Sequence, residues 1–218
     1  MSDAGIAELE QRIGVAPGFF DGLVQEDDWS FVIKLHALLE AACTHFLLVH
    51  FKEPALGDVL ARLELSNKTT GKVAFLAALE LVAKPSRRYI SALSELRNSL
   101  VHDVRQSRFR LSEWVASLDP AQVKSFAVAF SPYETKLREM QALPMLKVDL
   151  SLPAQATVEA VVARAREHPK QHIWLGAHNV LVEIVDMHGY SDYLQWSKAK
   201  ALLFEDEAVQ QGDEADER

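Results

Sequence analysis

Three polar side chains that could act on a phosphodiester lie close together near the end of one amphipathic segment. They are Arg97, Asn98 and His102, and the segment runs from about Ser86 to Asp103. On a helix, Asn98 and His102 are four residues apart and share a face, while Arg97 lies about 100° away with a side chain long enough to reach the same side. A guanidinium can hold a phosphate, an amide can orient it, and an imidazole can transfer protons. The spacing therefore indicates a phosphodiester site on one helix.

A purely structural role explains the same residues in another way. A protonated histidine or an arginine near a helix C-terminus gains about 0.3–1 kcal/mol from the helix dipole. Arg97 can also pair with Glu40, on the first long apolar helix, or with Asp103. Lys34 and Glu40 are candidates for supporting the motif helix and positioning Arg97. Ordinary exposed ion pairing is the alternative interpretation of Lys34 and Glu40.

The charge distribution places the motif in a basic region of an acidic chain. The net charge is -8, yet residues 1–30 and 205–218 each hold seven acidic residues and one basic residue, which leaves +4 on residues 31–204. Residues 84–110 hold seven basic and two acidic residues. A surface that binds anions accounts for this excess, and a solvated helix face is the alternative. The candidates for anion contacts are Arg87, Arg88, Arg105 and Arg108.

Length and composition predict a soluble, globular protein. The chain has 218 residues, 49% of them hydrophobic and 25% charged, which is enough for one sizeable core or for a domain with an appendage. Its longest apolar run, around Phe46 to Phe51, is far shorter than the roughly 20 residues that span a bilayer. The first residues lack the basic region of a signal peptide, so we expect a cytoplasmic location. The single cysteine, Cys43, lies in an apolar segment and predicts a buried small hydrophobic residue.

Apolar residues recur at three- and four-residue steps over most of the chain, which predicts an all-α fold. Asp28 or Ser30 is the expected N-cap of the first long helix. A short strand is expected at 146–150, in a proline-punctuated stretch that is the best candidate for a domain boundary. The predicted helices cover residues 28–51, 54–63, 70–83, 86–103, 112–118, 120–130, 155–168, 171–188 and 191–204. The predicted organisation is an acidic segment with a short helix over 1–27, a helical domain over 28–131, a helical C-terminal extension over 145–204 and a disordered acidic tail over 205–218.

The order of these features resembles the HEPN superfamily, and within it the mannitol operon repressor group. A long first helix is followed by the connector Leu65-Ser66-Asn67-Lys68-Thr69-Thr70-Gly71-Lys72 and then by a helix ending Leu93-Ser94-Glu95-Leu96-Arg97-Asn98-Ser99-Leu100-Val101-His102. The superfamily motif is an arginine, four to six residues and a histidine, often with asparagine after the arginine. The resemblance covers about residues 28–104 and implies a HEPN-like helical bundle.

The resemblance implies a metal-independent endoribonuclease that needs no cofactor and is completed by homodimerisation. RNA cleavage by the 2'-hydroxyl needs a base, an acid and cations around the phosphorane. A two-fold axis would supply a second His102, while Arg97 stabilises the phosphorane and Asn98 orients the imidazole or the phosphate. RNA is then the partner of the four flanking arginines. Such an enzyme is expected as the toxin of a toxin–antitoxin or phage-defence pair, with an antitoxin protein as a further partner.

The same resemblance also implies functions without catalysis. Members of the repressor-like group are described as transcriptional regulators, and several HEPN domains are not enzymes. A non-catalytic regulator or protein-interaction module is therefore the second hypothesis, and a partner or target of a nucleotidyltransferase is the third.

Other patterns in the sequence carry weaker predictions. Thr70-Gly71-Lys72 lacks the first glycine and the final hydroxyl of a phosphate-binding P-loop. His168 and His172 have the spacing of zinc ligands, but Pro169 is expected to break their helix and leave separate surface and core histidines. His36 and His45 lie on the first long helix, and His50 lies at its end. Packing against the motif helix is expected for these histidines, and one of them lining the cleft is the alternative. The aromatic residues of the C-terminal segment are expected in the core or a dimer contact, with stacking on RNA bases as the alternative; they include Trp174, Tyr193 and Trp196.

Overall fold

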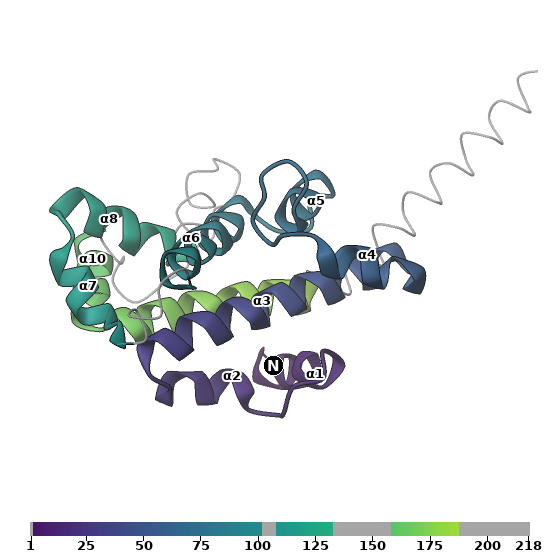
Figure 1. The fold of residues 1–218 in the computed structure, drawn as a ribbon, viewed down its shortest axis with the longest axis horizontal. Coiled ribbons are helices and arrows are strands. Elements are labelled where there is room, and N and C mark those ends of the chain that lie inside the picture. Colours follow the sequence, from purple (N-terminus) through teal and green to yellow (C-terminus); the bar gives the residue numbers. More distant parts are fainter. Residues whose placement is uncertain (1, 102–107, 133–157, 188–218) are drawn as a thin grey trace, which may run out of the picture.

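The computed structural model describes residues 2–101, 108–132 and 158–187, and every regular element in these ranges is a helix (Figure 1). The all-α fold class is therefore confirmed. The long helix α3 runs through the middle, with α1 and α2 on one side and α6 on the other. The elements are α1 (Ser2–Arg12), α2 (Phe19–Gly22), η1 (Leu23–Gln25), α3 (Asp28–Phe51), η2 (Pro54–Leu56), α4 (Gly57–Arg62), α5 (Lys72–Ala78), α6 (Lys84–Val101), α7 (Leu111–Ser117), α8 (Pro120–Ala129) and α10 (Val158–Glu167), followed by a further helix over residues 169–187.

Helix α3 is the central core helix and has the predicted bounds, Asp28–Phe51. Its N-cap is Asp27, one residue before the first expected position, and the Asp27 carboxylate accepts a hydrogen bond from the Ser30 amide at 2.9 Å. By length and composition alone α3 could cross a bilayer. Ten of its side chains are buried in the protein core, and a central helix of a soluble fold has the same apolar composition.

The segment between α3 and α6 forms shorter helices than the sequence pattern predicts. Residues 54–62 form η2 and α4 in succession. The helix predicted over 70–83 is reduced to α5, Lys72–Ala78, because Glu80 adopts a left-handed conformation with φ 57° that ends the helical path. The preceding loop folds around Asn67, whose side-chain oxygen accepts hydrogen bonds from the amides of Thr69 and Thr70 at 3.0 Å.

Helix α6 begins at Lys84, two residues before the predicted start. Pro85 lies in the first turn, where a helix tolerates proline because no intrahelical N–H bond is lost there. Ser86 does not act as a cap; its hydroxyl donates to Glu183 at 2.5 Å, and the same carboxylate accepts the Ala83 amide at 2.7 Å. The start of α6 is therefore fixed by a side chain from the C-terminal part of the chain.

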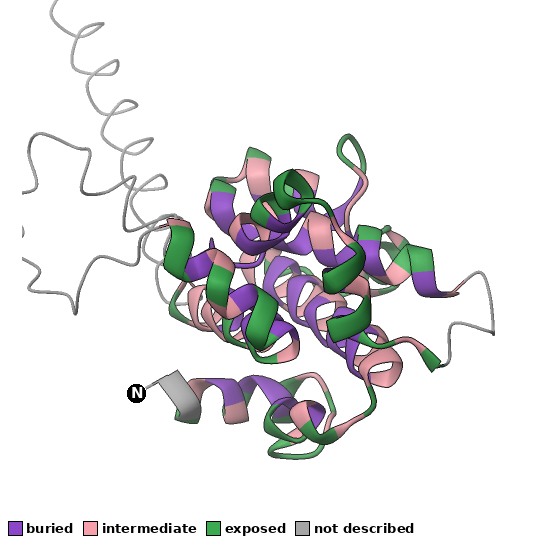
Figure 2. Cartoon of the chain, turned by 90° about the vertical axis from the view of Figure 1, so that its left-hand side faces the viewer, coloured by how far each residue is buried: buried purple, intermediate pink, exposed green. Residues whose placement is uncertain are grey.

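The described part of the C-terminal extension belongs to the same core as the preceding helices (Figure 2). The predicted helix pair is confirmed as α10 and residues 169–187. The helical path is interrupted at His168, and a new helix begins at Pro169. Gly176 packs against the Phe130 carbonyl and the Tyr89 ring so closely that a Cβ there would lie 2.3 Å from the carbonyl oxygen. Five wholly buried side chains come from the last described helix: Ile173, Ala177, Val180, Leu181 and Ile184.

Several predictions fall outside the described residues. They are the strand at 146–150, the helix at 191–204 with Tyr193 and Trp196, and the acidic tail at 205–218. The division at 131–145 also stays a prediction.

Candidate functional site

The candidate site lies at the C-terminal end of α6, where that helix packs antiparallel to α3. The Trp29 indole N–H donates to the Leu100 carbonyl at 3.3 Å, and His36 Nε2 lies 3.2 Å from Ser94 Oγ. These two pairs fix the register of the helices and place Arg97 level with residues 32–34 of α3. The N-terminal end of α3 therefore supports the motif end of α6.

Arg97 and Asn98 are adjacent and bonded to each other. Arg97 Nη1 donates to Asn98 Oδ1 at 3.1 Å, with Arg97 half-buried and Asn98 exposed. Within the described ranges Arg97 makes no ion pair with an acid, and its bond to Asn98 uses one of the five N–H donors of the guanidinium. His102 and Arg105, the other residues predicted here, lie outside those ranges.

Glu40 does not pair with Arg97, as one structural interpretation of the motif expected. It lies seven residues along α3 from the level of Arg97, about 10 Å along the axis. Its carboxylate instead accepts the Lys72 ammonium at 2.8 Å. Lys34, the other predicted supporting residue, pairs with Glu26 at 2.5 Å, and the side chains of both Lys34 and Glu26 are partly exposed. Among the described residues, neither Lys34 nor Glu40 therefore forms a side-chain hydrogen bond or ion pair with the motif helix.

His36 is the α3 side chain that does contact the motif helix. The Ser94 hydroxyl donates to the Ile90 carbonyl at 2.9 Å, so its oxygen is left to accept the His36 Nε2–H. Burial lowers the pKa of His36; the Glu40 charge acts in the opposite direction, while Arg97 and Lys72 lower the pKa further. The expectation that His36 packs against the motif helix is confirmed, and the imidazole is held neutral beside Arg97.

Within the described residues, the flanking arginines Arg87, Arg88 and Arg108 do not gather around Arg97. Arg87 and Arg88 lie nine or ten residues earlier on α6, about 14–15 Å along the axis. Arg88 reaches the Val128 carbonyl on α8 at 3.4 Å. Arg108 is exposed and lines a hollow of about 430 Å³ together with Arg110, Glu113 and Ser99. Because Ser99 is two residues from Arg97, this hollow opens on a different side of α6.

The weaker sequence patterns resolve into structural roles. The Lys72 side chain is 0% exposed, and its ammonium also donates to the Leu63 carbonyl at 2.7 Å, so it cannot reach a nucleotide. His172 is buried; its Nε2 donates to the Ala127 carbonyl at 2.9 Å and its Nδ1 accepts from Arg164 at 3.4 Å. His172 is a core histidine, as predicted, and His168 is exposed.

Trp174 is held inside the fold rather than on an open face. Its ring stacks on Phe20 at a centroid distance of 4.9 Å, and its indole N–H donates to the Phe20 carbonyl at 3.1 Å. Glu10 and Asp21 lie near this ring, although in the sequence they stand out only as part of an acidic segment. No sequence signal connects them with Trp174, because the two regions are about 150 residues apart.

Comparison of the chain with protein-family models, with curated proteins and with solved structures gives no match.

Proposed function

We propose that the protein is a HEPN-type endoribonuclease in which Arg97, Asn98 and His102 act on RNA. The observation that carries the proposal is the arginine at the exposed end of α6: its only described partner is the neutral amide of Asn98. An arginine that has no acidic partner among the described residues and lies beside an amide is suited to a phosphate, which a guanidinium binds through two parallel N–H bonds.

The proposed reaction needs groups beyond one Arg–Asn pair. The 2'-hydroxyl attacks phosphorus while a base accepts its proton, and an acid protonates the 5'-oxygen as the P–O bond breaks, which leaves a 2',3'-cyclic phosphate. We assign these proton transfers to His102 from two chains of a homodimer. Arg97 stabilises the phosphorane charge, and Arg108 and Arg110 in the hollow on the other side of α6 offer contacts for RNA backbone beyond the cleaved phosphate.

The proposal includes a cytoplasmic location and, as partner proteins, a second copy of the chain and an antitoxin. Ten side chains of α3 are buried, which supports the interpretation that its apolar residues belong to the protein core.

The test compares RNA cleavage by wild type, Arg97→Ala, His102→Ala and Arg62→Ala in EDTA, with the products analysed for a 2',3'-cyclic phosphate. Arg62 is an exposed arginine in the last turn of α4 and serves as the matched control. We expect Arg97→Ala to lose about 10²–10³-fold in rate, because one stabilising donor is worth that much. His102→Ala should lose about 10²–10⁴-fold, because it removes the general acid and base, while the control retains activity. Equal activity in Arg97→Ala would refute the assignment. A dimeric, folded wild type that cleaves no RNA would support the regulator hypothesis.

A further inference from the structure

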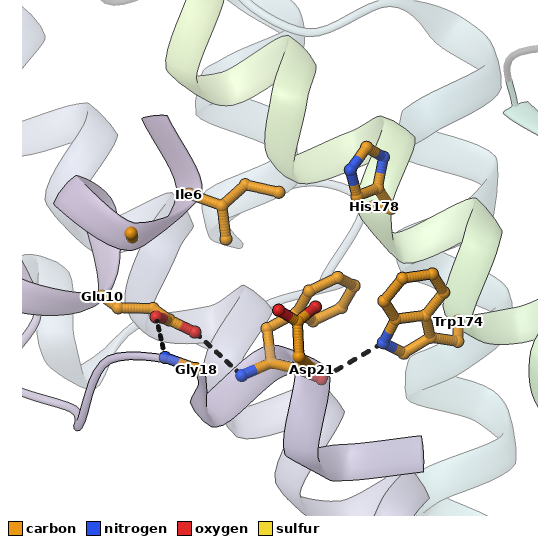
Figure 3. Close-up of a pocket in the computed structure, with 8 residues that line it drawn as sticks. Ile6, Glu10, Gly18, Asp21, Trp174 and His178 are labelled. Carbon is orange, nitrogen blue, oxygen red and sulfur yellow. Dashed lines mark hydrogen bonds between the residues drawn. The ribbon is translucent and has the colours of Figure 1, made fainter. Parts of the chain in front are cut away.

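A small cavity lies between the N-terminal helices and the helix over residues 169–187, away from the candidate site (Figure 3). Its volume is about 190 Å³, roughly the space of six water molecules. Ligand pockets for drug-sized molecules are larger, about 300–1,000 Å³, so this cavity fits a compact molecule. Ile6 comes from α1, Asp21 from α2, and Trp174 and His178 from the C-terminal helix.

One wall of the cavity is aromatic and fixed in place. The rings of Phe20 and Trp174 are stacked at 4.9 Å with an interplanar angle of 12°, and because Phe20 is only 1% exposed it supports the Trp174 ring from behind. His178 lies 5.9 Å from the Trp174 ring and 6.2 Å from the Phe20 ring. The hydrogen bond from the Trp174 indole to the Phe20 carbonyl holds the large ring in its orientation. A ligand would meet this wall already formed, which reduces the entropy lost on binding.

The opposite side of the cavity carries two carboxylates. Glu10 is only 2% exposed, and its oxygens accept the amides of Gly18 at 2.7 Å and Phe20 at 2.8 Å. The Asp21 carboxylate points into the space between Glu10 and Trp174 in Figure 3. It makes no hydrogen bond or ion pair within the part of the chain that the structure describes. The cavity therefore combines negative charge with aromatic surface.

These features select the chemical class of the ligand. The two carboxylates disfavour an anion, and among the described residues no group of three His, Cys, Asp or Glu side chains could hold a metal ion. Aromatic rings stabilise organic cations, and apolar Ile6 accepts methyl groups. Both Glu10 oxygens are already occupied, so only Asp21 remains as a charged acceptor. A methylated ammonium, which needs few hydrogen-bond acceptors, suits this wall better than a primary ammonium with three donors.

We propose that this cavity binds a small methylated ammonium ion, with Asp21 as its counter-ion and with Trp174 and His178 as its aromatic wall, which the buried Phe20 ring supports from behind. The site is independent of the proposed RNA cleavage, since it shares no residue with the end of α6.

The probe is choline, compared with its uncharged counterpart 3,3-dimethylbutan-1-ol, in which carbon replaces nitrogen. Both are titrated into the full chain, and binding is followed through the indole N–H resonance of Trp174. We expect saturable binding of choline and about tenfold weaker binding of the alcohol, because only the cation interacts with the rings and the carboxylate electrostatically.

Asp21→Asn removes the charge and keeps the shape of the side chain, so this variant should fold and bind choline about tenfold more weakly. Asp58→Asn is the matched control, because Asp58 is also an exposed aspartate in the first turn of a short helix, α4, at the other end of α3. It should bind choline as wild type does. The proposal is wrong if choline shows no saturable binding, if the neutral alcohol binds equally well, or if Asp21→Asn leaves choline binding unchanged.

Discussion

Replacing Lys72 with methionine tests whether the buried ammonium holds the connector to the central helix. The Lys72 side chain is 0% exposed, and its Nζ donates to the Leu63 carbonyl at 2.7 Å, to Glu40 at 2.8 Å and to the Ala61 carbonyl at 3.4 Å. Methionine is unbranched, of similar length and apolar, so it keeps most of the packing and removes the charge and its three donors. The expected loss of stability therefore reports the polar contacts.

The size of the expected loss in the free energy of unfolding depends on how exposed the three oxygen acceptors of Lys72 are once the ammonium is removed. Removing one partner of a fully buried ion pair costs about 3–5 kcal/mol. The Glu40 side chain is 36% exposed, so water can solvate its carboxylate after the substitution. The residues that supply the two carbonyls are not buried either. We therefore expect a loss of about 2–3 kcal/mol in the free energy of unfolding, discounted for this solvation. In a chain of this size the loss lowers Tm by about 5–10 °C.

The assay is urea unfolding followed by far-UV circular dichroism, with Lys68→Met as the matched control. Lys68 is an exposed lysine of the same connector, and its substitution should change stability by less than about 0.5 kcal/mol. The double variant Lys72→Met, Glu40→Gln should recover part of the loss, because it no longer leaves a charge without its partner. A Lys72→Met protein within about 0.5 kcal/mol of wild type would refute the reasoning.

Three further predictions concern other parts of the fold. The folded-state pKa of His36 is lowered from 6.5, so the neutral imidazole contributes its full stabilisation above pH 6.5, and this stabilisation is lost as the pH falls below that value. The urea midpoint of wild type should therefore drop more steeply from pH 7 to pH 5 than the midpoint of His36→Gln. Equal slopes for the two proteins would contradict this. A chain ending at residue 145 lacks the wholly buried side chains of residues 173–184 and should show no cooperative thermal transition, which calorimetry measures. Asp119→Ala removes the capping box of α8, in which Asp119 and Gln122 bond each other's backbone, and should cost about 1 kcal/mol in urea unfolding; an unchanged midpoint would show that the cap contributes nothing.

The sequence predicted helices best where local pattern and local capping agree. The bounds of α3 follow from continuous apolar periodicity and from an aspartate at its start. The pattern around α5 failed because Leu79, Leu81 and Val82 continue the apolar spacing although the chain turns at Glu80. Leu81 and Val82 are buried after that turn, so their burial reflects tertiary packing rather than a helical face. Periodicity detects which side chains are buried and does not detect the turn between them.

In the candidate site, contacts between residues that are neighbours in the sequence could be predicted. Contacts between distant segments of the chain could not. Arg97 and Asn98 are adjacent in sequence, and their contact follows from helix geometry. The partner of Glu40 depends on how residues 57–72 fold back, which places Lys72 against α3 from 32 positions away. The cavity at Asp21 depends on the packing of α1 and α2 against the C-terminal helix, which no local pattern encodes.

Among the described residues, three acidic side chains on α3 and just before it pair with lysines and not with Arg97. Asp28 binds Lys170 at 2.7 Å and also accepts the Leu111 amide at 2.8 Å. Glu26 pairs with Lys34, and Glu40 pairs with Lys72. Each of these three carboxylates is matched with a lysine, so none of the three neutralises the guanidinium at the end of α6. A guanidinium that these carboxylates leave unneutralised keeps its charge for an anion, which is the electrostatic condition that the proposed phosphate contact requires.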